Sequence, residues 1–340
     1  MFETRLCTTA MGILPHTDVE AALALAMSVD IPFWPQLPRT SFYEDMYAQA
    51  SEGLPGAVLD LENERVTFDT ARFYDELLGY AEASQDPAYF SLSPAYSAVY
   101  QRFLALDFRD RVAIRGQMIG PISFGLKIAD EARRPIIYNS DVKAILLEFL
   151  AGKINRQLAE MQAVHPNAFV WLDDPGLEFI FSSLSGYTDM VAREDLAEFL
   201  SNLHGLKGLH LCGNPDWDFL LGASLDLLSF DAYARGEVLV RYTDQIRRFL
   251  DRGGVLSWGI VPTGTSDLTG EDVQTLAGRL EAQWDYLAGQ GIDRERIVRQ
   301  GMLAPATCCL VNPDRALTVE RAFALVRAVS ETLRERYRLY

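Results

Sequence analysis

The stretch "SDVKAILLEFLAGKINRQLAEMQAV" (140–164) leads, after a short connection, into "AFVWLDD" (168–174). The first segment opens with a Ser-Asp start signal and places apolar residues at helical spacing, which predicts an amphipathic helix. The second is a short run that is apolar on both faces and ends in two carboxylates, as is typical of a strand buried between helices. A long helix that leads into a buried strand is the repeating unit of an α/β fold.

The same alternation runs along most of the chain. The strand candidates are 6–12, 30–36, 111–118, 168–174, 208–212, 225–231, 254–260 and 301–308. The main helical patterns are 18–29, 140–164, 193–204, 239–252, 269–289 and 318–337. Eight buried strands that alternate with helices predict an α/β fold of the (β/α)8 TIM-barrel class.

The stretch from about 40 to 110 interrupts this alternation. It is rich in Tyr, Phe, Pro and Ser and carries at least two helical patterns. We interpret it as an elaborated segment inserted between strands two and three, near the barrel mouth. The sequence shows no internal repeat and no low-complexity tract. We therefore expect residues 1–340 to form a single TIM-barrel domain that carries this insertion.

The composition argues against several classes of function. The chain has 340 residues, of which 49% are hydrophobic, and a formal net charge of −16 at pH 7. An acidic chain without a basic stripe does not suit a nucleic-acid partner. We see no apolar run of about 18 residues, as a transmembrane helix requires, and the first residues lack the pattern of a signal peptide. We therefore expect no membrane association. Four cysteines, two of them adjacent, do not look like a disulfide framework, so we expect a reducing, cytoplasmic location.

One short apolar run carries two scarce side chains. The run "GLHLC" (208–212) contains His210 and Cys212, in a chain with four histidines and four cysteines. Residues two apart on a strand point to the same side, so both side chains can reach one ion. Taken alone, the pair is better explained as a buried cysteine and a hydrogen-bonded histidine.

Further chemically competent residues end neighbouring strands. They are Asp173 and Asp174 after the fourth strand, Asp231 after the sixth and Cys308 after the eighth. In a barrel such positions meet at the carboxyl-terminal face, where active sites lie. The two adjacent aspartates also suit a capping role ahead of "PGLEF" (175–179). Because Cys308 ends another strand at the same face, a metal site becomes the better interpretation of His210 and Cys212.

The ligand types indicate which metal. One histidine and two cysteines form a set soft enough to prefer zinc. With Asp231 or a water in the fourth position, the site would be open to a substrate. A thiol that bound there would lose its proton and become a strong nucleophile toward an electrophilic methyl group. The other scarce residues have structural interpretations: Cys7 and Cys309 in packing, His165 and His204 at helix ends.

Six motifs along the chain point to one family. They are "TTAMGILPHT" (8–17), "RGQMIGPISF" (115–124), "WLDDPGL" (171–177), "HLC" (210–212), "LLSFD" (227–231) and "TCCL" (307–310). In this order they resemble motifs in the catalytic barrel of the cobalamin-independent methionine synthase family. More broadly, the chain looks like the superfamily that includes uroporphyrinogen decarboxylase and the zinc methyltransferases.

The resemblance implies a metal centre and a reaction. Zinc would be held by His210, Cys212 and Cys308, with Asp231 where the family has a zinc-binding Glu. The reaction would be methyl transfer to the thiol of homocysteine or a similar compound, giving methionine or a related thioether.

The resemblance also implies how the substrate is held. Its ammonium group would pair with Asp173, with Asp174 nearby, and we expect these two to be the catalytic carboxylates. Its carboxylate would meet backbone N–H groups of Met11, Gly12 and Ile13. Ion pairing of an amine and capture of a carboxylate by N–H groups are both physically reasonable.

Several features depart from the family pattern. Ile13 stands where the family has Ser, Asp231 where it has Glu and Cys309 where it has Gly, and the loop 259–267 contains no histidine. The family enzyme also has a second barrel that helps hold a polyglutamyl methylfolate. Because this chain has one barrel, we expect a methyl-corrinoid donor, delivered by a corrinoid protein, with 5-methyltetrahydrofolate as the alternative.

Two other functions compete with the methyltransferase. One is a metal-free lyase of the uroporphyrinogen decarboxylase type, whose arginine-rich early segment is matched here in "PFWPQLPRTSF" (32–42) by Arg39 alone. The other is a non-catalytic partner protein that binds zinc or a corrinoid. Decarboxylation gives no reason for a histidine and two cysteines to meet, which favours the zinc enzyme.

Overall fold

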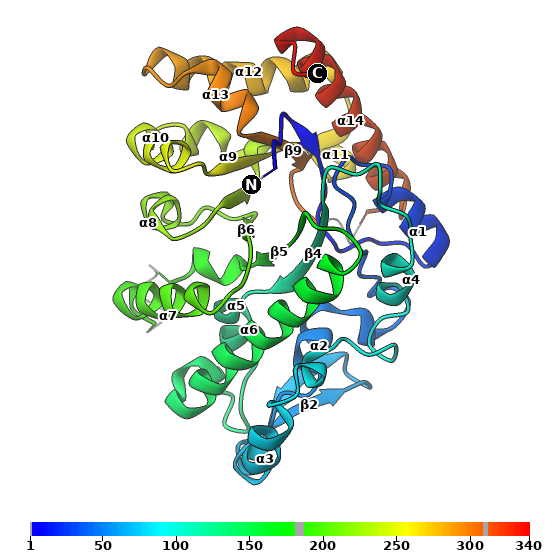
Figure 1. The fold of residues 1–340 in the computed structure, drawn as a ribbon, viewed down its shortest axis with the longest axis vertical. Coiled ribbons are helices and arrows are strands. Elements are labelled where there is room, and N and C mark those ends of the chain that lie inside the picture. Colours follow the sequence, from blue (N-terminus) through cyan, green and yellow to red (C-terminus); the bar gives the residue numbers. More distant parts are fainter. Residues whose placement is uncertain (1, 181–186, 309–311) are drawn as a thin grey trace.

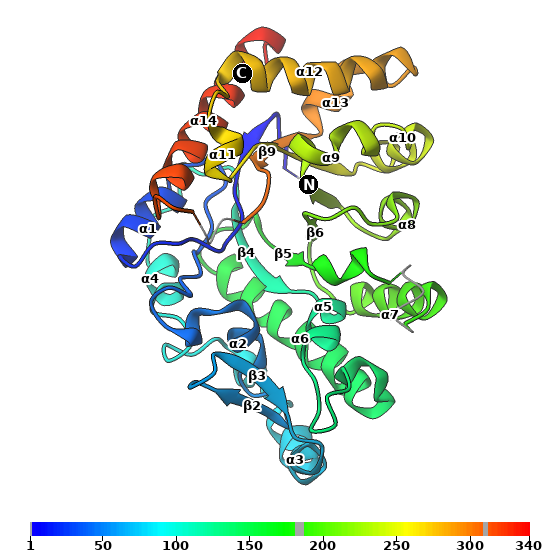
Figure 2. The ribbon, with the colours of Figure 1, turned by 180° about the vertical axis from the view of Figure 1, so that it is seen from behind.

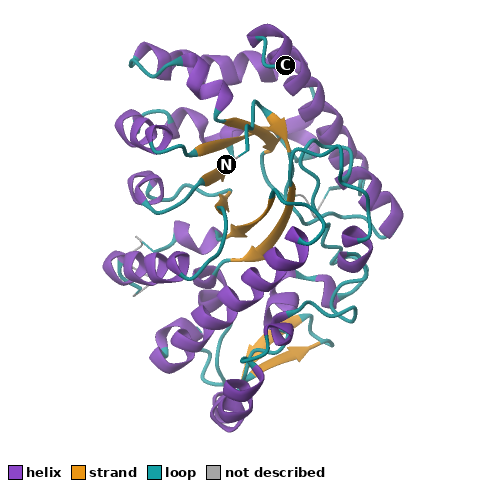
Figure 3. Cartoon of the chain, in the orientation of Figure 1, coloured by secondary structure: helices purple, strands orange, loops and turns teal. Residues whose placement is uncertain are grey.

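A curled sheet of parallel strands forms the centre of the molecule (Figure 3). The computed structural model describes residues 2–180, 187–308 and 312–340. Within them the sheet has seven strands in the order β1-β9-β8-β7-β6-β5-β4. These strands are β1 (Cys7–Thr8), β4 (Ile114–Ile119), β5 (Ala168–Asp173), β6 (Lys207–Leu211), β7 (Leu227–Phe230), β8 (Val255–Val261) and β9 (Gly301–Pro305). Seven of the eight predicted strand positions therefore carry strands.

Helices cover the outer side of the curl (Figure 1). The helices between the strands and after the last one are α1 (Val19–Ala26), α5 (Pro121–Lys127), η3 (Ile136–Tyr138), α6 (Ser140–Gln162), η4 (Pro175–Glu178), α7 (Asp189–Ser201), α8 (Trp217–Gly222), α9 (Ala232–Leu239), α10 (Thr243–Asp251), α11 (Thr265–Leu268), α12 (Val273–Gly289), α13 (Arg294–Arg299) and α14 (Leu317–Tyr337). The side chain of Asn139 caps α6 by accepting hydrogen bonds from two backbone N–H groups, so this helix begins where the Ser-Asp signal predicts. In the part of the chain that the structure describes, no helix combines the length and apolar character needed to span a bilayer.

The predicted second strand, 30–36, does not form as a strand. Pro32 and Pro35 have no backbone N–H, so the segment cannot supply the donors of a regular ladder. It lies between β1 and β4 and forms one isolated bridge with the segment after β1 and one with β4 itself, so within the described residues no continuous eight-stranded ladder closes the curl. The two bridges are Ile13↔Gln36 and Phe33↔Arg115.

Side chains of β4 bind the backbone where this ladder is missing. Gln117 Nε2 donates a hydrogen bond of 2.8 Å to the carbonyl oxygen of Trp34. The guanidinium of Arg115 donates to the carbonyl oxygen of Ala10 and to Thr9 Oγ1 at 3.4 Å. The bonds to Trp34 and Ala10 satisfy carbonyl groups that a regular strand would pair with backbone donors.

The segment predicted as an insertion lies beside α5 and β4 and folds into η1 (Phe42–Glu44), α2 (Met46–Ser51), the hairpin of β2 (Ala57–Asp60) and β3 (Arg65–Phe68), α3 (Thr70–Ala83), η2 (Pro87–Phe90) and α4 (Tyr100–Leu104). In Figures 1 and 2 its hairpin and α3 lie at the opposite end of the molecule from α12. Tyr47 stacks on Phe124 with ring centroids 6.0 Å apart, which places α2 at the carboxyl end of β4.

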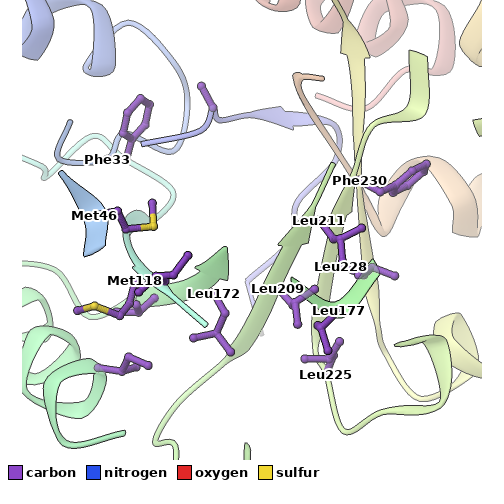
Figure 4. Close-up of a cluster of buried hydrophobic side chains, with 14 of the residues drawn as sticks. Phe33, Met46, Met118, Leu172, Leu177, Leu209, Leu211, Leu225, Leu228 and Phe230 are labelled. Carbon is purple, nitrogen blue, oxygen red and sulfur yellow. The ribbon is translucent and has the colours of Figure 1, made fainter. Parts of the chain in front are cut away.

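Alternate residues of the strands enter two separate hydrophobic clusters. One cluster lies between the sheet and the helices and includes Leu172, Leu209 and Leu228 (Figure 4). The other includes Phe169 and Trp171 and, among the described residues, contains no helical residue. Because neighbouring residues on a strand point to opposite faces, the second cluster fills the inside of the curl. Polar residues that share its side of the strands therefore point into the curl.

Candidate functional site

The register of the parallel strands aligns three polar residues on the inner side of the sheet. Asp173 of β5 is the Cα partner of His210 of β6, and His210 is the Cα partner of Ser229 of β7. The imidazole of His210 stacks on Trp171, with ring centroids 5.9 Å apart and planes 11° from parallel. Arg115 lies over the Trp171 ring at 4.1 Å from its centroid. The predicted histidine ligand thus belongs to a polar and aromatic group inside the curl.

His210 has the properties of a metal ligand. Burial lowers its pKa to about 3, with a further contribution from the charge of Arg115, so the imidazole is neutral at pH 7. Its Nδ1 is 3.0 Å from Ser229 Oγ. No hydrogen bond to another described residue engages Nε2. A neutral ring with one nitrogen anchored and the other free suits metal binding.

Cys212 follows β6 directly, and the loop after it is held by Glu178. The Asn214 N–H, two residues beyond the thiol, donates a 3.0 Å hydrogen bond to Glu178 Oε1. The loop packs closely here, since a Cβ built on Gly213 would lie 2.3 Å from Glu178 Oε2. The thiol is half-buried, and burial together with the charge of Asp173 raises its pKa.

Asp231 and Cys308 lie on a shared cavity of about 620 Å³ at the carboxyl ends of β7, β8 and β9. Asp231 is buried and caps α9, because its Oδ1 accepts a 2.8 Å hydrogen bond from the Ala234 N–H. Burial raises the pKa of this carboxyl group. Cys308 is exposed and lies three residues beyond Pro305, the last residue of β9, so the predicted strand 301–308 ends earlier than expected. These two predicted ligands therefore form a second pair, and neither His210 nor Cys212 lines their cavity.

The carboxyl ends of the strands form what we call the mouth of the curl, and the side chains there include groups that can bind zinc. A neutral imidazole, two thiols and a carboxylate are ligands that zinc accepts. The described residues nevertheless contain no group of three or more His, Cys, Asp or Glu side chains placed to hold one ion. Zinc binding would therefore have to bring Cys308 toward His210 and Cys212. The predicted packing role of Cys309 concerns a position outside the described residues.

Asp173 differs from its neighbour in what surrounds its carboxyl group. Burial raises the pKa of Asp173 to about 7, while the positive charge of Arg115 acts in the opposite direction. The Arg115 side chain is fully buried and forms no ion pair with a carboxylate in the part of the chain that is described. A carboxyl group that titrates near neutral pH at the mouth of the curl can pair with an amine.

Asp174 is fully buried and holds two segments of backbone together. Its Oδ1 accepts hydrogen bonds from the N–H of Ser123, at 2.7 Å, and from the hydroxyl of the same residue. The Ser123 hydroxyl in turn accepts a hydrogen bond from the Gly176 N–H at 2.6 Å. Burial raises the Asp174 pKa to about 6. The structure thus gives Asp174 a positioning role at the start of α5 and η4, and its catalytic role stays a prediction.

The segment Met11–Ile13 offers backbone donors at the carboxyl end of β1. Among the described residues none accepts a hydrogen bond from the N–H groups of Met11, Gly12 or Ile13. Met11 and Gly12 are buried. A Cβ on Gly12 would lie 2.3 Å from the Gln117 side chain, so the glycine is required by this close approach. Buried N–H groups without partners are rare, and they are consistent with the predicted capture of a carboxylate.

Sequence reasoning missed four residues that shape this site. Arg115, Trp171 and Ser229 lie within apolar strand runs, and each points to the inner side. For Trp171 and Ser229 the sequence does carry a signal, because residues two apart on a strand lie on the same face. Trp171 precedes Asp173 by two residues, and Ser229 precedes Asp231 by two. Glu178 gives no such signal, because its partner, Asn214, is distant in the sequence.

Comparison with known proteins identifies the fold but no family. No protein-family model matches the chain, and no curated protein matches its sequence. Among solved structures the chain is similar to a methyltransferase from Methanosarcina mazei, with a TM-score of 0.57 and 16% sequence identity. The match covers 97% of this chain and 94% of that one. At this identity the likeness establishes a shared fold, and the resemblance to the methionine synthase family stays a hypothesis.

Proposed function

We propose that this protein is a zinc-dependent methyltransferase that methylates the thiol of homocysteine or a similar amino acid. Zinc would be bound by His210, Cys212 and Cys308, with Asp231 or a water in the fourth position, which the substrate thiol would take. The observation that carries the proposal is the position of His210 and Cys212. They lie two residues apart at the carboxyl end of β6, and no described residue forms a hydrogen bond with the ring nitrogen Nε2 or a disulfide with the thiol.

Two further observations support the proposal. The fold is shared over nearly the whole chain with a protein described as a methyltransferase. The mouth also offers complementary groups for the two ends of an amino acid. Asp173 supplies a carboxylate for the ammonium group, and the segment Met11–Ile13 supplies N–H donors for the carboxylate.

When bound, zinc would lower the pKa of the substrate thiol so that the sulfur reacts as a thiolate. The residues of the chain would contribute by orienting the substrate. Asp173 and the Met11–Ile13 N–H groups would fix the amino acid so that its sulfur faces the methyl donor. The new sulfur–carbon bond forms as the donor–methyl bond breaks, and the donor keeps that electron pair. The thiol proton leaves to solvent before transfer.

The donor we favour is a methyl-corrinoid carried by a partner protein. Methylfolate is a poor methyl donor, and both substrates would have to meet at the curled sheet that the described residues form. The acidic surface of the chain gives no reason to expect a polyanionic folate chain as the ligand. The alternative donor is 5-methyltetrahydrofolate.

A transfer assay tests this function. Purified protein with zinc would be given homocysteine and either methylcobalamin or 5-methyltetrahydrofolate, and methionine would be measured. We expect product with methylcobalamin, loss of at least tenfold in Cys212→Ala, and unchanged activity in the control Cys7→Ala. Zinc binding without methylation of any thiol tested would favour a non-catalytic partner protein, whereas absence of zinc binding would favour the metal-free lyase.

A further inference from the structure

Ser229 and Ser257 occupy equivalent positions on neighbouring strands of the curl. They are Cα partners on β7 and β8, and both are fully buried. Their hydroxyl groups differ in what they contact. Ser229 Oγ is 3.0 Å from Nδ1 of His210, whereas Ser257 Oγ has no hydrogen-bond partner among the described residues.

The bond to Ser229 controls which ring nitrogen of His210 is available. A neutral imidazole carries one proton, on Nδ1 or on Nε2. If the ring binds a metal through Nε2, the proton must reside on Nδ1 and requires an acceptor. Within the described part of the chain, Ser229 Oγ is the hydrogen-bond partner that the structure gives to this ring. A serine hydroxyl can serve either tautomer, since it both donates and accepts.

Neighbouring rings leave the imidazole little freedom to find another partner. The ring stacks on Trp171 with nearly parallel planes, and Trp171 is itself fully buried beneath Arg115. Stacking fixes the plane of the imidazole but does not determine which nitrogen points toward the mouth. The hydrogen bond to Ser229 supplies that missing constraint.

We propose that Ser229 is the positioning residue of the metal site, which accepts a hydrogen bond from Nδ1–H of His210 and so presents the Nε2 lone pair to zinc. This inference rests on the proposed function, because it assigns a role within the same site. It predicts that a buried hydroxyl that never contacts the ion controls how tightly the ion binds. Partners of this kind typically change metal affinity by about 10- to 100-fold when they are removed.

Paired variants and two measurements test the inference. Zinc affinity would be measured by competition with a chromophoric chelator in wild type, Ser229→Ala and Ser257→Ala. The ring nitrogens of His210 would be followed by nitrogen NMR after selective histidine labelling, which is practical with four histidines in the chain. Thermal unfolding would be measured on the same samples to establish that each variant is folded.

The expected result is a loss of zinc affinity of about 10- to 100-fold in Ser229→Ala and little change in Ser257→Ala. In zinc-bound wild type the proton should be on Nδ1, and Ser229→Ala should shift the His210 nitrogen signals even without zinc. If wild type binds zinc and Ser229→Ala binds it equally well, the inference fails while the proposed function stands. Equal losses in both serine variants would also overturn it. If wild type takes up no zinc, the proposed function fails, and an unshifted His210 spectrum in metal-free Ser229→Ala would then overturn the inference as well.

Discussion

Asp173 and His210 are directly paired residues on adjacent parallel strands, β5 and β6. The proposed acceptor of the substrate amine therefore lies beside the proposed zinc ligand. An amino acid with its ammonium group on Asp173 would have its side chain free to reach toward Cys212, two residues beyond His210. The pairing explains how one mouth could recognise an amine and activate a thiol.

The raised pKa of Asp173 gives the first prediction. Above about pH 7 the carboxyl group is ionised and can pair with an ammonium group, and below that pH it is protonated and cannot. Binding of an amino-acid ligand should therefore weaken as pH falls from 8 to 6. Asp173→Asn should bind about tenfold or more weakly at pH 8, since a charge-assisted hydrogen bond contributes about 1.5–3 kcal/mol, and should lose this pH dependence.

Calorimetric titration with methionine at several pH values is the measurement. Methionine is chosen because it has the amine and carboxylate of homocysteine but no thiol that titrates. A variant that keeps the wild-type pH dependence would show that the amine is held elsewhere.

The hydrogen bond from the Asn214 N–H to Glu178 gives the second prediction. Glu178→Ala removes the acceptor that holds the loop after Cys212, so zinc affinity should fall by about tenfold. Glu178→Gln keeps a carbonyl oxygen at the same place and should retain most of the affinity. Chelator competition on both variants checks this, and equal affinities in the two would refute the positioning role.

The burial of Asp174 gives the third prediction. Asp174→Ala leaves the N–H and hydroxyl of Ser123 without their acceptor, which should lower the free energy of unfolding by roughly 1–3 kcal/mol. Asp174→Asn keeps an acceptor oxygen and should be milder. Urea titrations followed by circular dichroism measure both.

The same carboxyl group should contribute a pH dependence to stability. Its pKa in the folded protein, about 6, lies above the ordinary value, so folding favours the protonated form. The contribution to stability is full below about pH 4 and is lost as pH rises through about 6. Asp174→Asn should remove this component, and an unchanged pH profile in that variant would contradict the assignment.

The sequence predicts the alternation of buried parallel strands and helices because strand runs and helical periods are local patterns, but it does not reveal that the sheet stays an unclosed curl of seven strands among the described residues. The helix over 140–164 and the strand over 168–174 form almost as their patterns indicate, as α6 and β5. The prediction of a strand at 30–36 is wrong for a reason that the sequence itself contains, since Pro32 and Pro35 cannot donate hydrogen bonds to a strand ladder. The bonds of Arg115 and Gln117 across that gap join distant segments, and no local pattern indicates them.

The candidate site, too, can be predicted from the sequence only in part. Strand ends can be located in the sequence, so the gathering of Asp173, His210 and Cys212 at one edge was predictable. What each polar group contacts depends on side-chain packing between strands. For this reason the sequence suggests one role for Asp173 and Asp174, whereas in the structure Asp173 lies at the mouth and Asp174 is fully buried beneath it.

The central claim is that this chain binds zinc at the carboxyl end of its sheet. The most direct measurement is metal content by elemental analysis of protein purified under reducing conditions, for wild type, Cys308→Ala and the control Cys7→Ala. Cys7 is a suitable control because it is buried near the amino end of β1, and burial raises the pKa of its thiol to about 12. We predict about one zinc per chain in wild type and in Cys7→Ala, with zinc lost or much weakened in Cys308→Ala. Wild-type protein that contains no zinc and cannot take it up would contradict the account.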